Sequence, residues 1–114
     1  MADWIHACAC DEIDEEDLIR WDHGGRTYAI YNAEDGFYCT DGMCTHKATH
    51  LEQGLLTGHV IECPLHQGRF DIRSGKVVSP PPYEELNTYP VKTENGQVYV
   101  QVGYRKEEEN WESP

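Results

Sequence analysis

The sequence is poor in basic residues and contains no long apolar run. Lys and Arg together number 9 against 21 Asp and Glu, which gives a formal charge of −12. Phosphate groups and anionic lipids are bound by cationic faces, so nucleic acid and membrane surfaces are unsuitable partners. No apolar run approaches the roughly 18 residues of a membrane-spanning helix. No basic residue precedes Arg20, which argues against a secretory or mitochondrial leader. We therefore expect a cytoplasmic protein.

The acidic residues are concentrated at the two ends of the chain. Its 114 residues fit one compact domain. Residues 1–17 hold seven carboxylates and residues 107–114 hold four, and neither segment contains Lys or Arg. The residues between them carry ten carboxylates against nine cations. The acidic ends either keep the protein soluble or steer a basic protein partner, as charges at the rim of an interface do.

Five cysteines make an odd number, which is untypical of a disulfide framework. Metal binding and buried thiols are the better explanations in a cytoplasmic protein. Cys8 and Cys10 lie in a segment that alternates in polarity, as a strand with one buried face does. Cys39 lies in another short strand-like run. We expect these three thiols to pack in the core, because free cysteine is among the most buried residue types.

Short apolar or β-branched runs separated by turn signals indicate an all-β protein. Asn95 and Gly96 separate two alternating runs and predict a tight hairpin, because both residue types tolerate the positive φ of a type I′ turn. Only residues 12–17 and 48–51 suggest brief helical turns. Many short strands at this spacing are typical of a sandwich or a small barrel. The strand-like runs lie at residues 4–10, 18–21, 27–31, 36–40, 59–62, 69–72, 87–92 and 97–102.

Metal-binding residue types are concentrated in two short segments, C-T-H at residues 44–46 and C-P-L-H at residues 63–66. Sixteen residues separate them, enough for a hairpin that brings both segments side by side. Two thiolates and two imidazoles can hold one tetrahedral Zn²⁺. They can also hold a [2Fe–2S] cluster with both thiolates on one iron and both imidazoles on the other. Structural zinc sites usually pair Cys with Cys and His with His, whereas each segment here is mixed, which favours the cluster.

These residues resemble the Rieske [2Fe–2S] motif, C-x-H followed by C-x₂-H. The segment C-P-L-H-Q-G-R-F-D at residues 63–71 is similar to the second cluster loop of ferredoxins that serve bacterial aromatic-ring-hydroxylating dioxygenases, of the naphthalene type. The segment S-P-P-P-Y at residues 79–83 stands where that family has a proline-rich third loop. The N-T-Y-P-V-K segment at 87–92 resembles the family's C-terminal strands, and the likeness extends over roughly residues 4–102.

The resemblance implies a role for each motif residue. Cys44 and Cys63 would bind the buried iron as thiolates, and His46 and His66 would bind the outer iron near the surface. The added electron settles on the outer iron, because neutral imidazoles leave it less negative than thiolates would. Leu65 would help to exclude water, together with the proline before it. The implied cofactor is one Rieske-type [2Fe–2S] cluster per chain.

The implied architecture is an antiparallel β-sandwich base with a small cluster-binding subdomain. We expect a Rieske domain over residues 1–104, the subdomain over about 43–83, and an acidic C-terminal tail over 105–114. The implied function is one-electron transfer from an NAD(P)H-dependent flavoprotein reductase to the terminal oxygenase of an aromatic-ring dioxygenase system. A monomeric carrier rather than an enzyme is expected, because the chain is too short for the mononuclear iron domain of an oxygenase.

Two other interpretations stay open. A structural Zn²⁺ module would act as a protein-interaction domain. A small subunit of the nitrite reductase type would share the fold, but many of those lack the ligands that this sequence has in full. The organic substrate of the oxygenase and the identity of both redox partners cannot be inferred from the carrier's sequence.

The sequence predicts a low reduction potential for the cluster. Respiratory Rieske proteins have a disulfide between the ligand loops, and the corresponding positions here are Thr49 and Leu65. In those proteins a Ser hydroxyl and a Tyr hydroxyl also point toward the cluster sulfur and a ligand cysteine. The corresponding positions in this sequence are Gly68 and Phe70. Such hydrogen bonds stabilise the more negative reduced state, so their loss lowers the potential. We expect voltammetry to give about −150 mV, the low end of the Rieske range, and a value near +300 mV would contradict this comparison.

Overall fold

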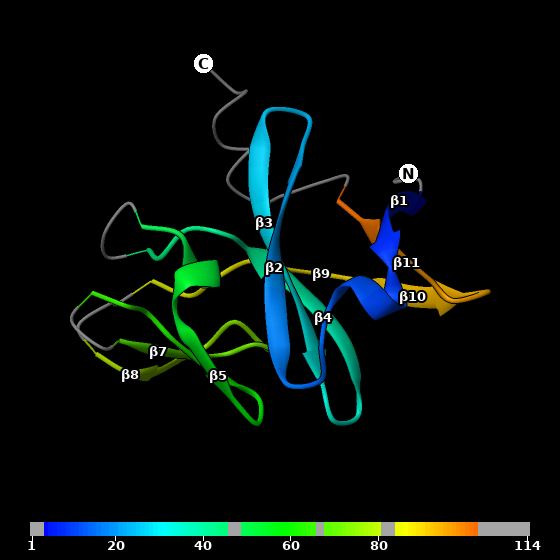
Figure 1. Ribbon diagram of the computed structural model, residues 1–114. Coiled ribbons are helices and arrows are strands. Elements are labelled where there is room, and N and C mark those ends of the chain that lie inside the picture. Colours follow the sequence, from blue (N-terminus) through cyan, green and yellow to red (C-terminus); the bar gives the residue numbers. More distant parts are fainter. Residues whose placement is uncertain (1–3, 46–48, 66–67, 81–83, 103–114) are drawn as a thin grey trace, which may run out of the picture.

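The computed structural model describes residues 4–45, 49–65, 68–80 and 84–102, and folds them into three antiparallel sheets (Figure 1). The expected all-β class is therefore confirmed. Only two single-turn 3₁₀ helices accompany the strands within these ranges, η1 at Cys10–Glu12 and η2 at Leu51–Gln53. They differ from the helical turns expected at 12–17 and 48–51. Residues 13–16 instead form a turn that leads into the next strand, and Ala48 lies outside the described residues.

The first sheet has the strand order β1-β11-β10, with β1 at Trp4–Ala9, β10 at Val91–Glu94 and β11 at Gln97–Gln101. Asn95 and Gly96 join β10 to β11 with φ values of 52° and 75°. Both residues of a type I′ turn require positive φ, so the hairpin expected from this dipeptide is confirmed. Trp4 lies 38% exposed on this sheet, and the ammonium of Lys92 is 4.9 Å from the centroid of its ring.

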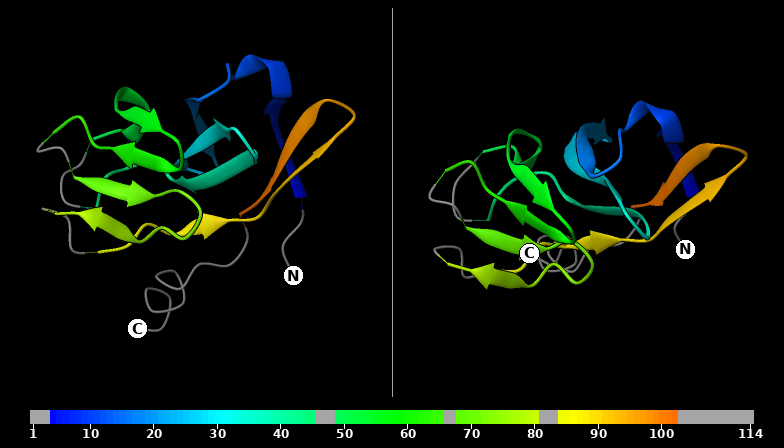
Figure 2. Two further views of the ribbon diagram at one scale, coloured as in Figure 1. Left: turned by 90° about the horizontal axis from the view of Figure 1, so that it is seen from below. Right: turned by 60° about the horizontal axis from the view of Figure 1, so that its bottom comes forward.

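The second sheet has the order β2-β3-β4-β9 and occupies the middle of the molecule (Figure 2). Its strands are β2 at Asp17–His23, β3 at Arg26–Ala33, β4 at Gly36–Asp41 and the short β9 at Thr88–Tyr89. One face packs against the first sheet, with Ile30, Val98 and Val100 all 0% exposed. Cys8 and Cys39 lie in this core, as expected, whereas Cys10 is half-buried at its margin.

The third sheet has the order β5-β6-β7-β8 and lies on the other side of the second sheet from the β10–β11 hairpin (Figure 2). Its strands are three residues each: β5 at Leu55–Thr57, β6 at Val60–Glu62, β7 at Arg69–Asp71 and β8 at Val77–Ser79. The sequence predicted β6 and β7 but not β5 or β8. All four strands are short, and each depends on pairing with its neighbours in the sheet.

The third sheet is fixed to the second by a core and by a polar contact. Ile61 and Phe70 are fully buried in a cluster that also contains Tyr31 of β3. His59, in the β5–β6 turn, lies with its Nε2 2.8 Å from the Oδ1 atom of Asp35 in the β3–β4 turn. The sequence placed His59 at the surface or in a turn, and did not predict this partner. Burial and the contact therefore hold the two sheets in one orientation.

Gly75 is required by a close approach between the β7–β8 turn and the segment before β9. Its φ is +80°, and an added Cβ would overlap the carbonyl oxygen of Leu86. The Gly75 carbonyl also accepts a hydrogen bond of 2.8 Å from the backbone N–H of Leu86. This turn and this segment therefore fit together only without a side chain at position 75.

We predict that Gly75→Ala destabilises the fold by roughly 3 kcal/mol, because it combines backbone strain with an overlap against main chain. Gly96→Ala is the matched control, since Gly96 has a similar φ of +75° but nothing within 4 Å of an added Cβ. It should cost only about 1 kcal/mol. Thermal melts of both variants measure the difference, and equal melting temperatures would show that the contact with Leu86 adds nothing.

Candidate metal centre

Two loops at one end of the molecule carry the predicted cysteine ligands. Cys44 follows β4, and its backbone N–H donates to the carbonyl of Thr49 at 3.0 Å. Cys63 follows β6, and its N–H donates to the carbonyl of Gly68 at 2.7 Å. Each bond spans five residues, so each cysteine begins a closed loop. Residues 46 and 66, the predicted histidine ligands, fall inside these loops in the sequence but outside the described residues.

The structure brings the two thiols together in the core. Cys44 is 6% exposed and Cys63 is 1% exposed, and both belong to the apolar cluster beneath the third sheet. Burial, and to a smaller extent a hydrogen bond with the Cys44 thiol, raise the pKa of the Cys63 thiol to about 11. A hydrogen bond from the backbone N–H of Leu65 acts in the opposite direction. At neutral pH the Cys63 side chain is therefore protonated unless a cation displaces the proton, which is what a metal does to cysteine.

The donor set fits an iron or zinc centre. Thiolates are the ligands that both zinc and iron–sulfur clusters select. Within the described ranges, no three His, Cys, Asp or Glu side chains converge in a way that could hold a metal ion. The cysteine pair would supply two ligands, and either a tetrahedral Zn²⁺ or a [2Fe–2S] cluster needs two more, for which His46 and His66 remain the prediction. The backbone N–H of Leu65, directed at Cys63, is the type of donor that stabilises thiolate sulfur.

A third segment is attached to the first loop. The hydroxyl of Thr45 donates to the carbonyl of Glu84 at 2.8 Å, so the residue between Cys44 and the predicted ligand at 46 is linked to the chain that follows the expected proline loop. Pro80 is exposed at the start of that loop, whereas residues 81–83 lie outside the described residues. The contact fixes the position of the first loop relative to residues 84–89.

The described surface next to the cysteines is apolar. Pro64 and Leu65 are exposed directly after Cys63, and Leu65 is 47% exposed. The outer face of the third sheet adds Leu55 and Val78, both more than half exposed. Exposed apolar residues of this kind, close to a metal centre, are suited to contact with a partner that must exclude water from the contact.

His50 was weighed as a substitute ligand in the zinc interpretation. It pairs with Met43 through a single β-bridge, and its Nδ1 is buried without a hydrogen-bond partner among the described residues. His6 contacts Gln97 with its Nε2 2.7 Å from the side-chain oxygen, on the first sheet. Neither histidine joins the two cysteines in a metal-binding group within the described ranges.

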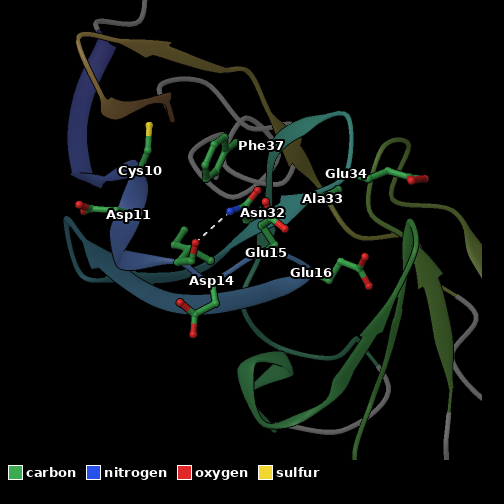
Figure 3. A pocket seen from close by; sticks show the side chains of 10 residues that line it. Cys10, Asp11, Asp14, Glu15, Glu16, Asn32, Ala33, Glu34 and Phe37 are labelled. Carbon is green, nitrogen blue, oxygen red and sulfur yellow. Dashed lines mark hydrogen bonds between the residues drawn. The ribbon is translucent and has the colours of Figure 1, made fainter.

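A hollow of about 550 Å³ lies in the base, and half of its lining residues are carboxylates (Figure 3). Inside it, the side-chain amide of Asn32 donates to the carbonyl of Ile13 at 2.9 Å. None of its lining residues is basic, and none is a predicted ligand. Residues of the acidic N-terminal segment line one part of it, and residues of β3, β4 and the turn between them line the rest. Its labelled lining residues are Cys10, Asp11, Asp14, Glu15, Glu16, Asn32, Ala33, Glu34 and Phe37.

Residues 3–90 match the family model of the Rieske [2Fe-2S] domain. The chain belongs to this Rieske family. It is 43% identical, over 87% of its length and 95% of the relative's, to the ferredoxin component of the naphthalene 1,2-dioxygenase/salicylate 5-hydroxylase systems of Ralstonia sp.. It is 42% identical to the biphenyl dioxygenase ferredoxin subunit of Pseudomonas sp. strain KKS102, over 82% of this chain and 87% of that one.

Solved structures agree with this assignment of the Rieske domain. The Sphingomonas yanoikuyae B1 ferredoxin superposes with a TM-score of 0.82 at 30% identity, covering 88% of this chain and 99% of the other. A chain of the complex of reduced oxygenase and oxidized ferredoxin in carbazole 1,9a-dioxygenase gives 0.82 at 35% identity, covering 86% and 92%. A putative nitrite reductase small subunit from Mycobacterium tuberculosis gives 0.81 at 17% identity, covering 92% and 99%, which shows a shared fold alone.

These comparisons confirm the Rieske ferredoxin fold and the cofactor, a [2Fe–2S] cluster. They also confirm the expected carrier role, since the relatives are ferredoxin components of oxygenase systems. The four residues expected to bind the cluster, Cys44, His46, Cys63 and His66, stay a prediction. For Cys44 and Cys63 the structure adds that both are buried and in contact.

The cysteines allow a direct test of the ligand set in this Rieske domain. We predict that Cys63→Ala abolishes cluster binding, whereas Cys39→Ala, an equally buried cysteine of the other core, keeps it. Iron and acid-labile sulfide should fall from two of each per chain to near zero in the Cys63 variant alone. A Cys63 variant that retains its iron and sulfide would refute the proposed ligation.

Proposed function

We propose that Cys44, His46, Cys63 and His66 bind the cluster and that the protein carries single electrons from a flavoprotein ferredoxin reductase to a terminal Rieske oxygenase. The observation that carries this proposal is the contact between two buried thiols, each at the start of a closed loop, within a Rieske ferredoxin fold. When bound, the cluster supplies one-electron redox chemistry at a potential raised by imidazole ligation.

The described residues around the cysteines have two functions in this proposal. The buried thiols and the core around them keep water from the inner side of the site, which strengthens electrostatic interactions there. Pro64 and Leu65 present an apolar surface that a partner can cover on docking. Redox encounters use small interfaces, so a contact limited to this end of the molecule suits a carrier that must leave each partner quickly.

The proposed partners follow from the relatives. Proteins 42–43% identical to this chain serve dioxygenase systems, and one similar ferredoxin is known in a complex with its oxygenase. The described residues include no helix long and apolar enough to cross a membrane. We further propose a monomeric, cytoplasmic carrier. Support comes from the odd number of cysteines in the sequence, five, which is untypical of a disulfide framework.

The proposed division of the chain is a Rieske domain over 1–104 with a cluster-binding subdomain over about 43–83. In support, the three-residue strands β5 to β8 all lie between residues 55 and 79 and form a sheet of their own. The proposed acidic tail, 105–114, lies outside the described residues.

Metal analysis with EPR spectroscopy tests the cofactor and the function together. We expect two irons and two sulfides per chain and, after dithionite reduction, the low-average-g signal of a Rieske cluster. One zinc without sulfide, persisting after attempted cluster reconstitution, would instead make the protein a structural zinc module.

Stopped-flow reduction by a flavoprotein reductase then tests the carrier role. The chain has a formal charge of −12, so we expect the second-order rate constant to fall as salt rises, because screening weakens the attraction to a basic docking face. Substituting the acidic residues of 11–17 should reduce both the rate and its dependence on salt. A rate that is insensitive to ionic strength would remove the steering role of these residues but not the carrier function.

A further inference from the structure

Asp41 is the last residue of β4 and lies three positions before Cys44 in the chain. Its Oδ2 accepts two hydrogen bonds from Asn87, one from the backbone N–H at 3.2 Å and one from the side-chain amide at 3.0 Å. Its Oδ1 accepts a hydrogen bond of 2.6 Å from the hydroxyl of Tyr89. The backbone N–H of Asp41 donates in return to the carbonyl of Asn87 at 3.0 Å. One carboxylate therefore joins the end of β4 to the segment that contains β9.

This carboxylate fixes the base of the first cysteine loop. Immediately beyond Asp41, the Gly42 N–H donates to the carbonyl of Thr27 at 3.0 Å, and the Gly42 carbonyl accepts from the Leu51 N–H at 2.8 Å. Further along, Thr45 is bonded to Glu84. The loop and residues 84–89 are thus connected on both sides of Cys44. Asp41 supplies three of these links through its side chain, so it helps to fix the position of Cys44.

Asp41 and Cys44 line the same hollow. Its volume is about 350 Å³, and Met43, Thr45 and the cationic Arg26 line it too. Both oxygens of the Asp41 carboxylate accept hydrogen bonds, from the two N–H donors of Asn87 and from the hydroxyl of Tyr89. The effective dielectric constant of a protein is about 20, so a charge that lines this hollow acts on the cysteine more strongly than it would through water.

We propose that Asp41 is a positioning residue of the cluster site whose negative charge lowers the reduction potential. This rests on the proposed ligation by Cys44. Reduction adds one electron to the site, and a fixed negative charge nearby opposes that addition. Hydrogen bonds from Asn87 and Tyr89 moderate the charge, because donors that face a carboxylate partly neutralise it. No local pattern in the sequence indicates this role, because residue 41 is far from residues 87 and 89 along the chain.

Voltammetry of the cluster-loaded protein tests the proposal with two variants of opposite expected sign. Asp41→Asn removes the charge at nearly constant shape, and should increase the equilibrium constant for reduction at least threefold, equivalent to about 28 mV for a one-electron couple. Tyr89→Phe keeps the charge but removes one donor, and should decrease the constant. Glu94→Gln is the control, because Glu94 is an exposed carboxylate in β10, on the far side of the molecule (Figure 1). It should leave the potential unchanged.

The opposite signs separate charge from structure. If the substitutions act only by loosening the loop, the potential should move in the same direction in Asp41→Asn and Tyr89→Phe, and that result would overturn the proposal. A potential of Asp41→Asn equal to that of Glu94→Gln would also overturn it. If Asp41→Asn fails to retain iron and sulfide, the direction of the Tyr89→Phe shift decides alone. A wild-type protein with no Rieske signal would refute the proposed function instead, so the two failures are distinguishable.

Discussion

Strand β3 is buried on both faces, and the rest of the structure depends on this constraint. Alternate side chains of a strand point to opposite sides. Tyr28 and Ile30 therefore enter the core shared with the first sheet, whereas Ala29 and Tyr31 enter the core beneath the third sheet. One strand thus separates two hydrophobic cores, and the core that contains Cys44 and Cys63 packs against the same strand as the sandwich does. A change in the packing of either core reaches the other through β3.

The polar groups that this arrangement buries are connected to the cluster site. The Tyr31 hydroxyl lies 2.8 Å from Thr40 Oγ1, and both residues are fully buried. The Thr40 hydroxyl donates to the carbonyl of Asp41 at 2.7 Å. Each hydroxyl therefore has a partner, as a buried polar group requires. These two hydrogen bonds connect the core beneath the third sheet, which contains Tyr31, to Asp41 at the base of the first cysteine loop. Buried groups therefore help to position this loop.

The sequence predicted those features that local chemistry encodes. The Asn95 and Gly96 turn needs only its own backbone preferences, and the two cysteine motifs need only their spacing. The strands β5 and β8, by contrast, are three residues long and owe their form to neighbours in the sheet. Gly75 looked like an ordinary turn glycine, because its contact with Leu86 joins distant parts of the chain. The role of Asp41 was hidden for the same reason.

Burial of the cysteine pair has a consequence for how the site assembles. Burial in apolar surroundings disfavours the thiolate of Cys63 and so raises its pKa. Iron binding requires thiolates, so metal insertion must release protons, and its favourable free energy has to exceed the cost of forming anions there. The apolar cluster that holds Cys44 and Cys63 also contains Tyr31 and Phe70, so the two sulfurs are brought together by packing of the fold itself. The framework of the proposed site therefore comes from this core, and the cluster would supply the cations that make the buried sulfur pair stable as thiolates.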